Sequence, residues 1–411
     1  MMVRKVVEYW RYPAILLVRI GIASIGSWIY FLALNVIVFN MTGSPLAVAI
    51  LYIIKPLATL FTNLWGGSVI DRVNKKHLMI ILDIIQATLI GCLALSVHTL
   101  WIIYILVFFI NIATSIYEPA SVSYVTRLIP REQRQRFNSL RSLLDSGAFL
   151  LGPAIGALLF LVESPLYAIM MNALALYLSA FITLFMPNVE KHSFPNATTT
   201  KLTLSIIKED LKVVFQFSRR FAYVITVYFL FSVFIVMQTA VDSLEVSFAK
   251  EVISLSDSDY LILVSTAGLG ILIGSFINAI FTKKLTIAFL ISVGSLMVSI
   301  GYLIFAFSSQ FMMASVGVFL LGFSLAFANT GFYTFYQNNI PVEVIGRIGS
   351  IYGFLEALLV IIATSLFAAS TMIFPIKFVV VLGAIIMLIL TSILLFITLQ
   401  PTKRHYFSTS A

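Results

Sequence analysis

The stretch GGSVIDRVNKKHLM, residues 66–79, places a cluster of charged residues between two long apolar runs. Asp71 and Arg72 are followed at once by Lys75 and Lys76, and apolar sequence then resumes. Charged side chains are costly inside a bilayer, whereas Lys and Arg gather in the loops on its cytoplasmic side. The stretch therefore predicts a short loop between two membrane-spanning helices.

The composition of the whole chain agrees with this prediction. Of the 411 residues, 60% are hydrophobic and 10% are charged, whereas soluble domains hold about 45–50% apolar and about 25% charged residues. The apolar runs do not alternate as barrel strands do, and each is close to the roughly 20 residues that a spanning helix needs. We expect an all-α membrane protein with twelve spans, at 14–40, 46–70, 77–96, 101–125, 138–162, 164–186, 221–248, 259–281, 285–307, 311–338, 349–372 and 377–399.

The placement of basic residues predicts the orientation of the chain. Of the 26 Lys and Arg residues, only Lys250 and Lys377 fall on the side opposite the termini, and Arg19, Lys55 and Arg141 fall within spans. The positive-inside rule then puts both termini in the cytoplasm. This topology explains the net charge of +9, so we expect no nucleic-acid partner. The first apolar run lacks a small-residue cleavage site and predicts a span, not a signal peptide.

A long polar interval divides the spans into two sets of six. We expect three parts: an N-terminal six-helix bundle over 1–186, a cytoplasmic linker over 187–220 and a C-terminal six-helix bundle over 221–411. The two halves repeat weakly, since IPREQRQRFNSLRSLLDS from Ile129 aligns with IPVEVIGRIGSIYGFLEA from Ile340. This alignment pairs Asp145 with Glu356 in spans 5 and 11. Duplicated halves are typical of transporters.

The linker contains a segment of helical periodicity, residues 202–218. Apolar residues recur along one side of it, with charged and polar residues opposite. Such an amphipathic helix suits the cytoplasmic surface of a membrane. A helix that binds a partner protein is the alternative.

Two motifs give the chain a family resemblance. Gly67-x-x-x-Asp71-Arg72-x-x-Lys75-Lys76 matches the signature loop of the major facilitator superfamily, and GAFLLGPAIGA at 147–157 is similar to the Gly-Pro-x-x-Gly motif of its drug:proton antiporters. With EPASVSYVTRLIPREQRQRFNSL before this motif, the chain most resembles the macrolide-efflux branch. The resemblance implies a fold of two six-helix pseudo-repeats, alternating access, no cofactor, a bacterial plasma membrane and function as a monomer.

The signature loop predicts a conformational latch. Gly67 lets two helices approach closely, and Asp71 is placed to accept hydrogen bonds from the start of a neighbouring helix. The resemblance implies that this neighbour is span 11. Arg72 stands beside Asp71, and Arg127 is a candidate cationic partner. The alternative is that these charges only orient the spans.

The second motif predicts a hinge in span 5. Pro153 cannot donate a backbone hydrogen bond, so the helix can bend there. Gly152 and Gly156 present small surfaces on which another helix can slide. A generic kink is the alternative, because glycine and proline are common in membrane helices.

Charged residues inside the spans are candidates for proton coupling, because each costs on the order of 2.5–3.5 kcal/mol at the bilayer centre. We expect Glu118, with Asp145 or Glu356, to carry a proton, and Arg141 to act as the cation beside Asp145. The alternative for Arg141 and Asp145 is a structural i,i+4 ion pair. The superfamily's span-4 arginine has no counterpart here, where Asn111 is the nearest polar residue, so proton coupling itself is open.

The resemblance places spans 1, 4, 7 and 10 around a substrate cavity. The candidates that line it are Trp28, Asn35, Asn111, Gln238, Asp242, Asn329 and Phe332. Apolar walls with few polar groups suit an amphiphilic ligand, and ring faces with acidic groups favour a cation. Lys55 is expected to pair with Asp242 as an outer gate. The alternatives are that Asp242 simply reaches water and that the aromatic side chains face lipid or pack.

The sequence lacks the motifs of an enzyme. It has no phosphate-binding glycine loop, no HExxH and no Cys or His cluster, and its one cysteine, Cys92, lies in a span where we expect a small buried side chain. We therefore expect no catalytic residues and no metal. The leading hypothesis is an exporter of small amphiphilic, drug-like or macrolide-like compounds by proton antiport. The alternative is a lipid or metabolite translocase on the same fold without proton coupling.

Overall fold

The computed structural model describes residues 2–63, 73–129, 131–162, 165–189, 204–281 and 285–407, and no strand occurs in these ranges. The helices are α1 (Met2–Thr42), α2 (Pro45–Asn63), α4 (Lys75–Leu95), α5 (Leu100–Leu128), α6 (Arg131–Val162), α7 (Pro165–Leu184), α8 (Leu204–Arg220), α9 (Ala222–Asp242), α10 (Glu245–Glu251), α11 (Asp257–Phe281), α12 (Ile287–Phe307), α13 (Phe311–Asn339), α14 (Val342–Ser370), α15 (Ile376–Thr398) and the 3₁₀ helix η1 (Pro401–Phe407).

Twelve helices of the described chain are long and apolar enough to cross a membrane. They follow the twelve predicted spans in order, which confirms the all-α membrane fold. One predicted boundary was wrong, because the span expected at 221–248 ends at Asp242. There the Ser243 hydroxyl donates a hydrogen bond to the Ala240 carbonyl oxygen at 2.7 Å, and such local bonds compete with the helical ladder.

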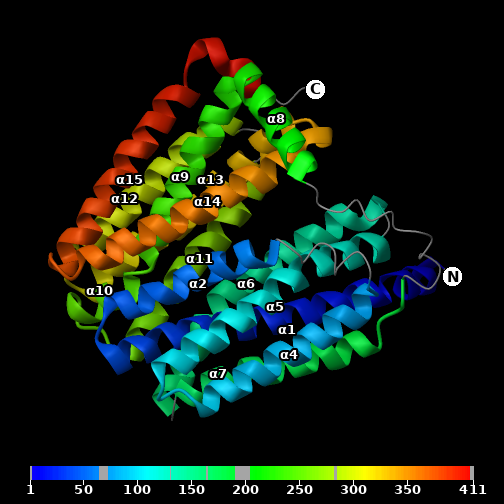
Figure 1. Ribbon diagram of the computed structural model, residues 1–411, viewed down its shortest axis with the longest axis horizontal. Helices are drawn as coiled ribbons and strands as arrows, with labels where there is room; N and C mark the ends of the chain where they lie inside the picture. Colours follow the sequence, from blue (N-terminus) through cyan, green and yellow to red (C-terminus); the bar gives the residue numbers. More distant parts are fainter. Residues whose placement is uncertain are drawn as a thin grey trace. The chain divides into compact units, whose positions relative to one another are not determined.

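The chain divides into two compact units, drawn in Figure 1. Unit 1 comprises Met1–Gly43 and Leu57–Thr199, and unit 2 comprises Ser44–Pro56 and Thr200–Ala411. The first part of α2 therefore belongs to unit 2, although it lies in the first half of the sequence. Helix α8 forms within the predicted linker. The predicted three-part division at 186 and 220 stays a prediction.

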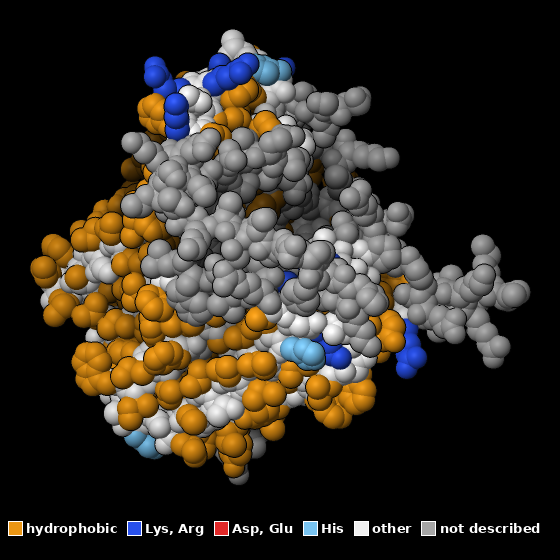
Figure 2. Space-filling view, turned by 45° about the vertical axis from the view of Figure 1, so that its right-hand side comes forward, with side chains coloured by type: hydrophobic (Ala, Val, Ile, Leu, Met, Phe, Trp, Pro, Cys, Tyr) orange, Lys and Arg blue, Asp and Glu red, His pale blue; other side chains and the backbone are white. Residues whose placement is uncertain are grey.

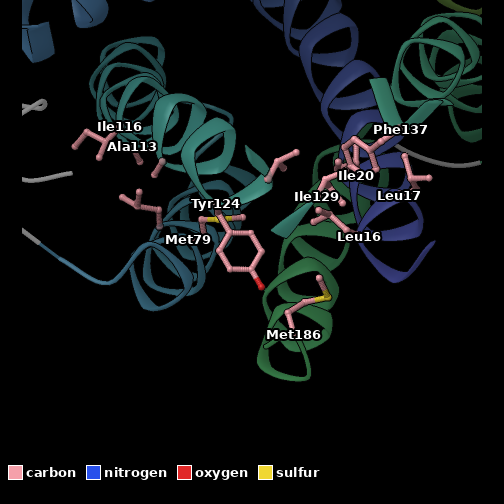
Figure 3. Packing of buried hydrophobic residues seen from close by; sticks show 13 residues of the cluster. Leu16, Leu17, Ile20, Met79, Ala113, Ile116, Tyr124, Ile129, Phe137 and Met186 are labelled. Atoms are coloured by element: carbon pink, nitrogen blue, oxygen red, sulfur yellow. The ribbon is translucent and has the colours of Figure 1, made fainter. Parts of the chain in front are cut away.

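Unit 1 has an apolar core built by α1, α4, α5 and α6. Leu16, Met79 and Phe137 are fully buried in it, and Figure 3 shows them with the other members of the cluster. Tyr124 is also fully buried, and its hydroxyl donates a hydrogen bond to the Pro187 carbonyl oxygen at 2.7 Å. The one polar atom that Tyr124 brings into the core is thereby satisfied.

The loop that opened the sequence analysis is described from residue 73 onward. Asn74 caps α4 by accepting a hydrogen bond from the His77 amide. Lys75 is buried, and the Lys76 ammonium donates to the Leu184 carbonyl oxygen at the end of α7, at 2.8 Å. Lys76 therefore joins the start of α4 to the end of α7 as well as flanking a span. The latch residues Gly67, Asp71 and Arg72 lie outside the described residues.

In unit 2, glycines let α11, α12 and α13 approach closely. A Cβ atom on Gly274 would overlap the carbonyl oxygen of Phe323, and one on Gly301 would lie 2.8 Å from the carbonyl oxygen of Gly317. Small residues are how membrane helices bring their backbones together.

Large apolar side chains cover the outer faces of the helices, as Figure 2 shows for one side of the molecule. Such a surface suits lipid, not water. Cys92 is exposed on α4, so the expectation that it is buried was wrong. It continues a stripe of exposed residues that includes Ile81 and Ile85, because these positions share one face of the helix.

Candidate functional site

A buried ion pair joins helices α1 and α4 inside unit 1. Arg19 Nη2 lies 2.8 Å from Asp83 Oδ2, and both side chains are 2% exposed. Ser179 of α7 donates a hydrogen bond to the same oxygen at 2.8 Å. Three spanning helices are thus connected by a pair of opposite charges, which is how charges persist in apolar surroundings.

Arg19 also faces Tyr117 of α5. Its guanidinium carbon lies 5.1 Å from the centre of the tyrosine ring, a cation–π distance. Among the described residues, neither Arg19 Nε nor the Tyr117 hydroxyl has a hydrogen-bond partner, and both are buried. Tyr117 precedes Glu118, whose side chain is exposed on unit 1. Arg19 therefore contacts the residue that precedes Glu118 in α5.

Asp145 lies on α6 where this helix meets α1. Ser24 donates a hydrogen bond to Asp145 Oδ1 at 2.9 Å, and Arg141 Nε lies 3.8 Å from Asp145 Oδ2. The two charged side chains are 38% and 49% exposed. This i,i+4 ion pair is therefore long and accessible to solvent. A pair of this kind contributes about 0–1 kcal/mol to stability. The part of Asp145 in proton coupling stays a prediction.

The predicted hinge is packed against α1. Helix α6 runs through Pro153, and Gly152, Pro153 and Gly156 are all buried. A Cβ atom on Gly152 would lie 2.5 Å from Cβ of Trp28, whose ring meets Phe149 edge-on with centroids 4.4 Å apart. Trp28 therefore fills the contact between α1 and α6 beside the proline.

In unit 2, Glu356 of α14 stands beside aromatic side chains. Its carboxyl group is within hydrogen-bonding reach of Ser232 of α9, which also reaches the Tyr228 hydroxyl. The ring of Tyr228 lies 5.2 Å from that of Tyr352 and 5.6 Å from that of Tyr336. A carboxylate inside a spanning helix thus has hydroxyl groups and ring faces around it.

Phe332, a predicted cavity residue, belongs to the same group. It stacks on Phe231 with centroids 4.0 Å apart and planes 7° from parallel, and its centroid lies 5.5 Å from that of Tyr228. We call the five rings the aromatic cluster: Tyr228, Phe231, Phe332, Tyr336 and Tyr352. Electron-rich ring faces beside a carboxylate can hold an organic cation.

Asp242 forms a second polar group in unit 2, at the end of α9. It accepts a hydrogen bond from the Tyr302 hydroxyl of α12 and is within reach of Gln238. Glu245 lies close enough to interact electrostatically with Asp242, so two carboxyl groups share this end of the unit. Lys55 is exposed on α2 in the same unit, and its pairing with Asp242 stays a prediction.

The remaining candidates lie on three helices, α1, α5 and α13. Asn35 is fully buried in α1, and the Asn111 amide donates a hydrogen bond to the Val107 carbonyl oxygen of its own helix at 2.8 Å. Asn329 is half-buried on α13, and Arg127 is exposed in the last turn of α5. Their predicted roles in the cavity and the latch stay predictions.

Sequence reasoning did not single out the hydroxyl partners of these charges. Ser179, Ser232 and Tyr302 stand far along the chain from the carboxyl groups that they reach. Serine and tyrosine are ordinary residues of spanning helices and follow no spacing rule here. The available signal was general, since a carboxylate in an apolar run requires some polar partner.

Twelve spans in two units, with carboxylates inside the spans, are the features of a membrane transporter. The sequence profile described as Major Facilitator Superfamily matches residues 16–364. The chain belongs to the Major Facilitator Superfamily. It is therefore a multi-pass membrane transporter and not an enzyme.

Two bacterial relatives illustrate how far the sequence similarity reaches. The uncharacterised MFS-type transporter YfiS of Bacillus subtilis (strain 168) is 31% identical over 210 residues, which cover 50% of this chain and 48% of YfiS. The multidrug resistance protein MdtH of Klebsiella pneumoniae (strain 342) is 23% identical over 173 residues, 42% of this chain and 43% of MdtH. The chain thus spans less than half the length of either relative.

Solved structures extend the similarity to nearly the whole fold. The nucleoside transporter NupG matches with a TM-score of 0.72 and 14% identity, over 95% of this chain and 99% of NupG. A POT family transporter in complex with a thioalcohol-conjugated peptide matches with a TM-score of 0.75 and 12% identity, over 94% and 96% of the two chains. At such identities the likeness concerns the fold alone.

Proposed function

We propose that this member of the superfamily exports small amphiphilic compounds, drug-like or macrolide-like, by proton antiport and alternating access. The observation that carries the proposal is Glu356 beside the aromatic cluster. A carboxylate near ring faces and apolar helices suits a lipophilic cation better than a sugar or an anion. The similarity to MdtH, a multidrug resistance protein, supports the same class of substrate.

In this mechanism a proton and a cationic substrate compete for the same carboxyl group. Glu356 is neutral when it carries the proton, and its negative charge is balanced by the substrate when it faces the cation. The carboxylate is therefore never left unpaired in the membrane. Glu118 and Asp145 are the further proton-coupling candidates in unit 1. One proton supplies about 2.3 kcal/mol per 100 mV and about 1.4 kcal/mol per pH unit, which is enough for modest uphill export.

Uptake of a lipophilic cationic dye into inverted vesicles tests the proposal. With an acidic interior, wild type should accumulate the dye, a protonophore should abolish accumulation, and Glu356→Gln should reduce it to the background of empty vesicles. Glu251→Gln is the matched control, because Glu251 is an exposed carboxylate on α10 outside the spans. Wild-type accumulation by Glu356→Gln would refute the role of Glu356.

The second candidate is a lipid or metabolite translocase without proton coupling. The observation that favours it is that Arg19 and Asp83, and likewise Arg141 and Asp145, are already paired within unit 1, so these charges can serve structure alone. Transport that is unaffected by the protonophore and by Glu118→Gln would select this candidate.

A further inference from the structure

The end of the described chain folds back onto unit 2. In η1, Tyr406 stacks on Tyr223 of α9 with centroids 4.9 Å apart, and Phe407 stacks on Phe335 of α13 with centroids 5.1 Å apart. The Asn339 amide donates a hydrogen bond to the Tyr406 carbonyl oxygen at 2.9 Å. These contacts fix η1 at the end of unit 2 where α9 begins.

This fold-back places a basic side chain of η1 beside the start of α9, the helix that directly follows the basic end of α8. Lys403 Nζ of η1 lies 5.4 Å from the centre of the Tyr223 ring, and the Arg220 guanidinium carbon at the end of α8 lies 5.6 Å from the centre of the Phe221 ring. We call the following residues the basic platform: Lys212, Arg219, Arg220, Lys403 and Arg404. Figure 2 shows blue Lys and Arg side chains gathered with a histidine at one end of the molecule.

Helix α8 adds apolar side chains to the platform. Leu211 and Phe215 are 49% and 63% exposed, and they are four residues apart, so they share one helix face. The Arg219 guanidinium carbon lies 5.9 Å from the centre of the Phe215 ring, which places charge and exposed ring together. Ser218 and Tyr352 share a hydrogen bond of 3.0 Å between their hydroxyl oxygens, which ties α8 to α14.

The depth of the platform relative to the spans is set by the sequence. Arg220 is followed within two residues by the span of α9, and Lys403 comes five residues after α15 ends at Thr398. The platform therefore lies at the level of lipid headgroups. The acidic residues of α8, Glu209 and Asp210, precede Arg219 by nine or ten positions, or about 14 Å along the helix.

We infer that the basic platform is a binding site for the headgroup of an anionic phospholipid, such as phosphatidylglycerol. Guanidinium and ammonium groups of α8 and η1 bind the phosphate, while Leu211 and Phe215 enter the upper acyl region, as in interfacial helices. Clusters of Lys and Arg next to a span attract anionic lipid. Each basic residue strengthens the binding of the lipid about severalfold. The lipid would hold α8 and η1 together, whatever substrate the protein carries.

Native mass spectrometry of the detergent-purified protein tests this site with phosphatidylglycerol and phosphatidylethanolamine as probes. Wild type should prefer phosphatidylglycerol, and R219Q/R220Q/K403Q/R404Q should bind it at least about tenfold more weakly. The matched control R11Q/K377Q removes two cations elsewhere and should bind like wild type. If the quadruple variant fails to fold, R219Q/R220Q and K403Q/R404Q should each lose part of the preference.

Two further measurements test whether binding depends on positive charge and whether the ligand is a lipid. R219K/R220K/R404K keeps the charges and should retain the preference for phosphatidylglycerol. A preference that survives R219Q/R220Q/K403Q/R404Q, or that R219K/R220K/R404K abolishes, would overturn the inference. Displacement of the lipid by millimolar glycerol 3-phosphate would also overturn it, because the site would then bind a soluble phosphate.

Discussion

Arg19 and Asp83 place two full charges in contact inside the core of unit 1. Replacing one of them leaves the other buried without its partner, which costs about 3–5 kcal/mol. Replacing both with leucine removes both charges and adds apolar contacts. We therefore expect Arg19→Leu and Asp83→Leu each to melt well below wild type, and the double variant Arg19→Leu/Asp83→Leu to recover most of the loss. Thermal unfolding of the purified proteins measures this.

Arg141 and Asp145 provide the control for that prediction. Their side chains are partly exposed and 3.8 Å apart, so Arg141→Gln should change stability by only about 0–1 kcal/mol. A double leucine variant no more stable than the single ones would show that Arg19 and Asp83 do not act as a pair.

Phe332 is the residue of the aromatic cluster whose ring face can be removed at little cost in volume. Phe332→Leu keeps an apolar side chain but removes the π face, and a cation–π contact is worth about 0.5–2 kcal/mol. We expect transport of a lipophilic cation to weaken by about two- to thirtyfold in KM, and transport of a neutral analogue to change little. Tyr333→Leu is the matched control, because Tyr333 is 61% exposed on the same helix. An equal change for both substrates would count against cation recognition.

Contacts between residues were predictable from the sequence where the physical rule is local. Arg141 and Asp145 are four positions apart, so helical spacing alone brings them together. Arg19 and Asp83 are 64 positions apart and Ser179 a further 96, and no local rule joins them. Arg19 and Asp83 were each visible as a charged residue in an apolar segment, but which residues they meet depended on how α1, α4 and α7 pack.

At the scale of elements, the packing of α11 against α13 depends on missing side chains. A Cβ atom on Gly322 would overlap the Ala267 carbonyl oxygen, and backbone cannot move aside as a side chain can. We expect Gly322→Ala to lower the melting temperature and the yield of folded protein. Gly353→Ala in α14 is the control, because its Cβ would meet nothing within 4 Å, and alanine is the better helix former by about 1 kcal/mol. Equal losses in both variants would contradict this account.

The hinge of α6 gives a second prediction about an element. Pro153→Ala restores the backbone donor, so the helix should stiffen without losing its contact with α1. We expect a several-fold lower transport rate with an unchanged melting temperature. Gly152→Ala should do the opposite and destabilise, because its Cβ would lie 2.5 Å from that of Trp28. Comparable loss of rate and stability in Pro153→Ala would mean that the proline only shapes the fold.

Elements were predictable because twenty apolar residues in a row have few alternatives in a bilayer. The break after Asp242 was missed for the same reason, since the apolar run continues through Val246 and Phe248 while Ser243 turns the backbone. The sequence pattern also could not predict to which compact unit α2 belongs. Residues Ser44–Pro56, which include the first part of this helix, group with unit 2, and only three-dimensional packing decides that.

At the scale of the whole molecule, the distribution of charge predicts which side of the membrane each loop occupies. Met372, between α14 and α15, is 75% exposed, and Thr402 is exposed in η1 at the other end of α15. Cys92 is the single cysteine, so Cys92→Ser gives a cysteine-free background for labelling.

In that background, a membrane-impermeant maleimide added to intact cells should label Met372→Cys and not Thr402→Cys. Opening the membrane should expose Thr402→Cys to the reagent, because Lys403 and Arg404 beside it hold this end in the cytoplasm under the positive-inside rule. The reverse pattern would invert the topology and with it the direction assigned to transport. The labelling of Thr402→Cys therefore also tests the side of the basic platform. Anionic lipid can reach the platform only from the cytoplasmic leaflet if Thr402 lies in the cytoplasm.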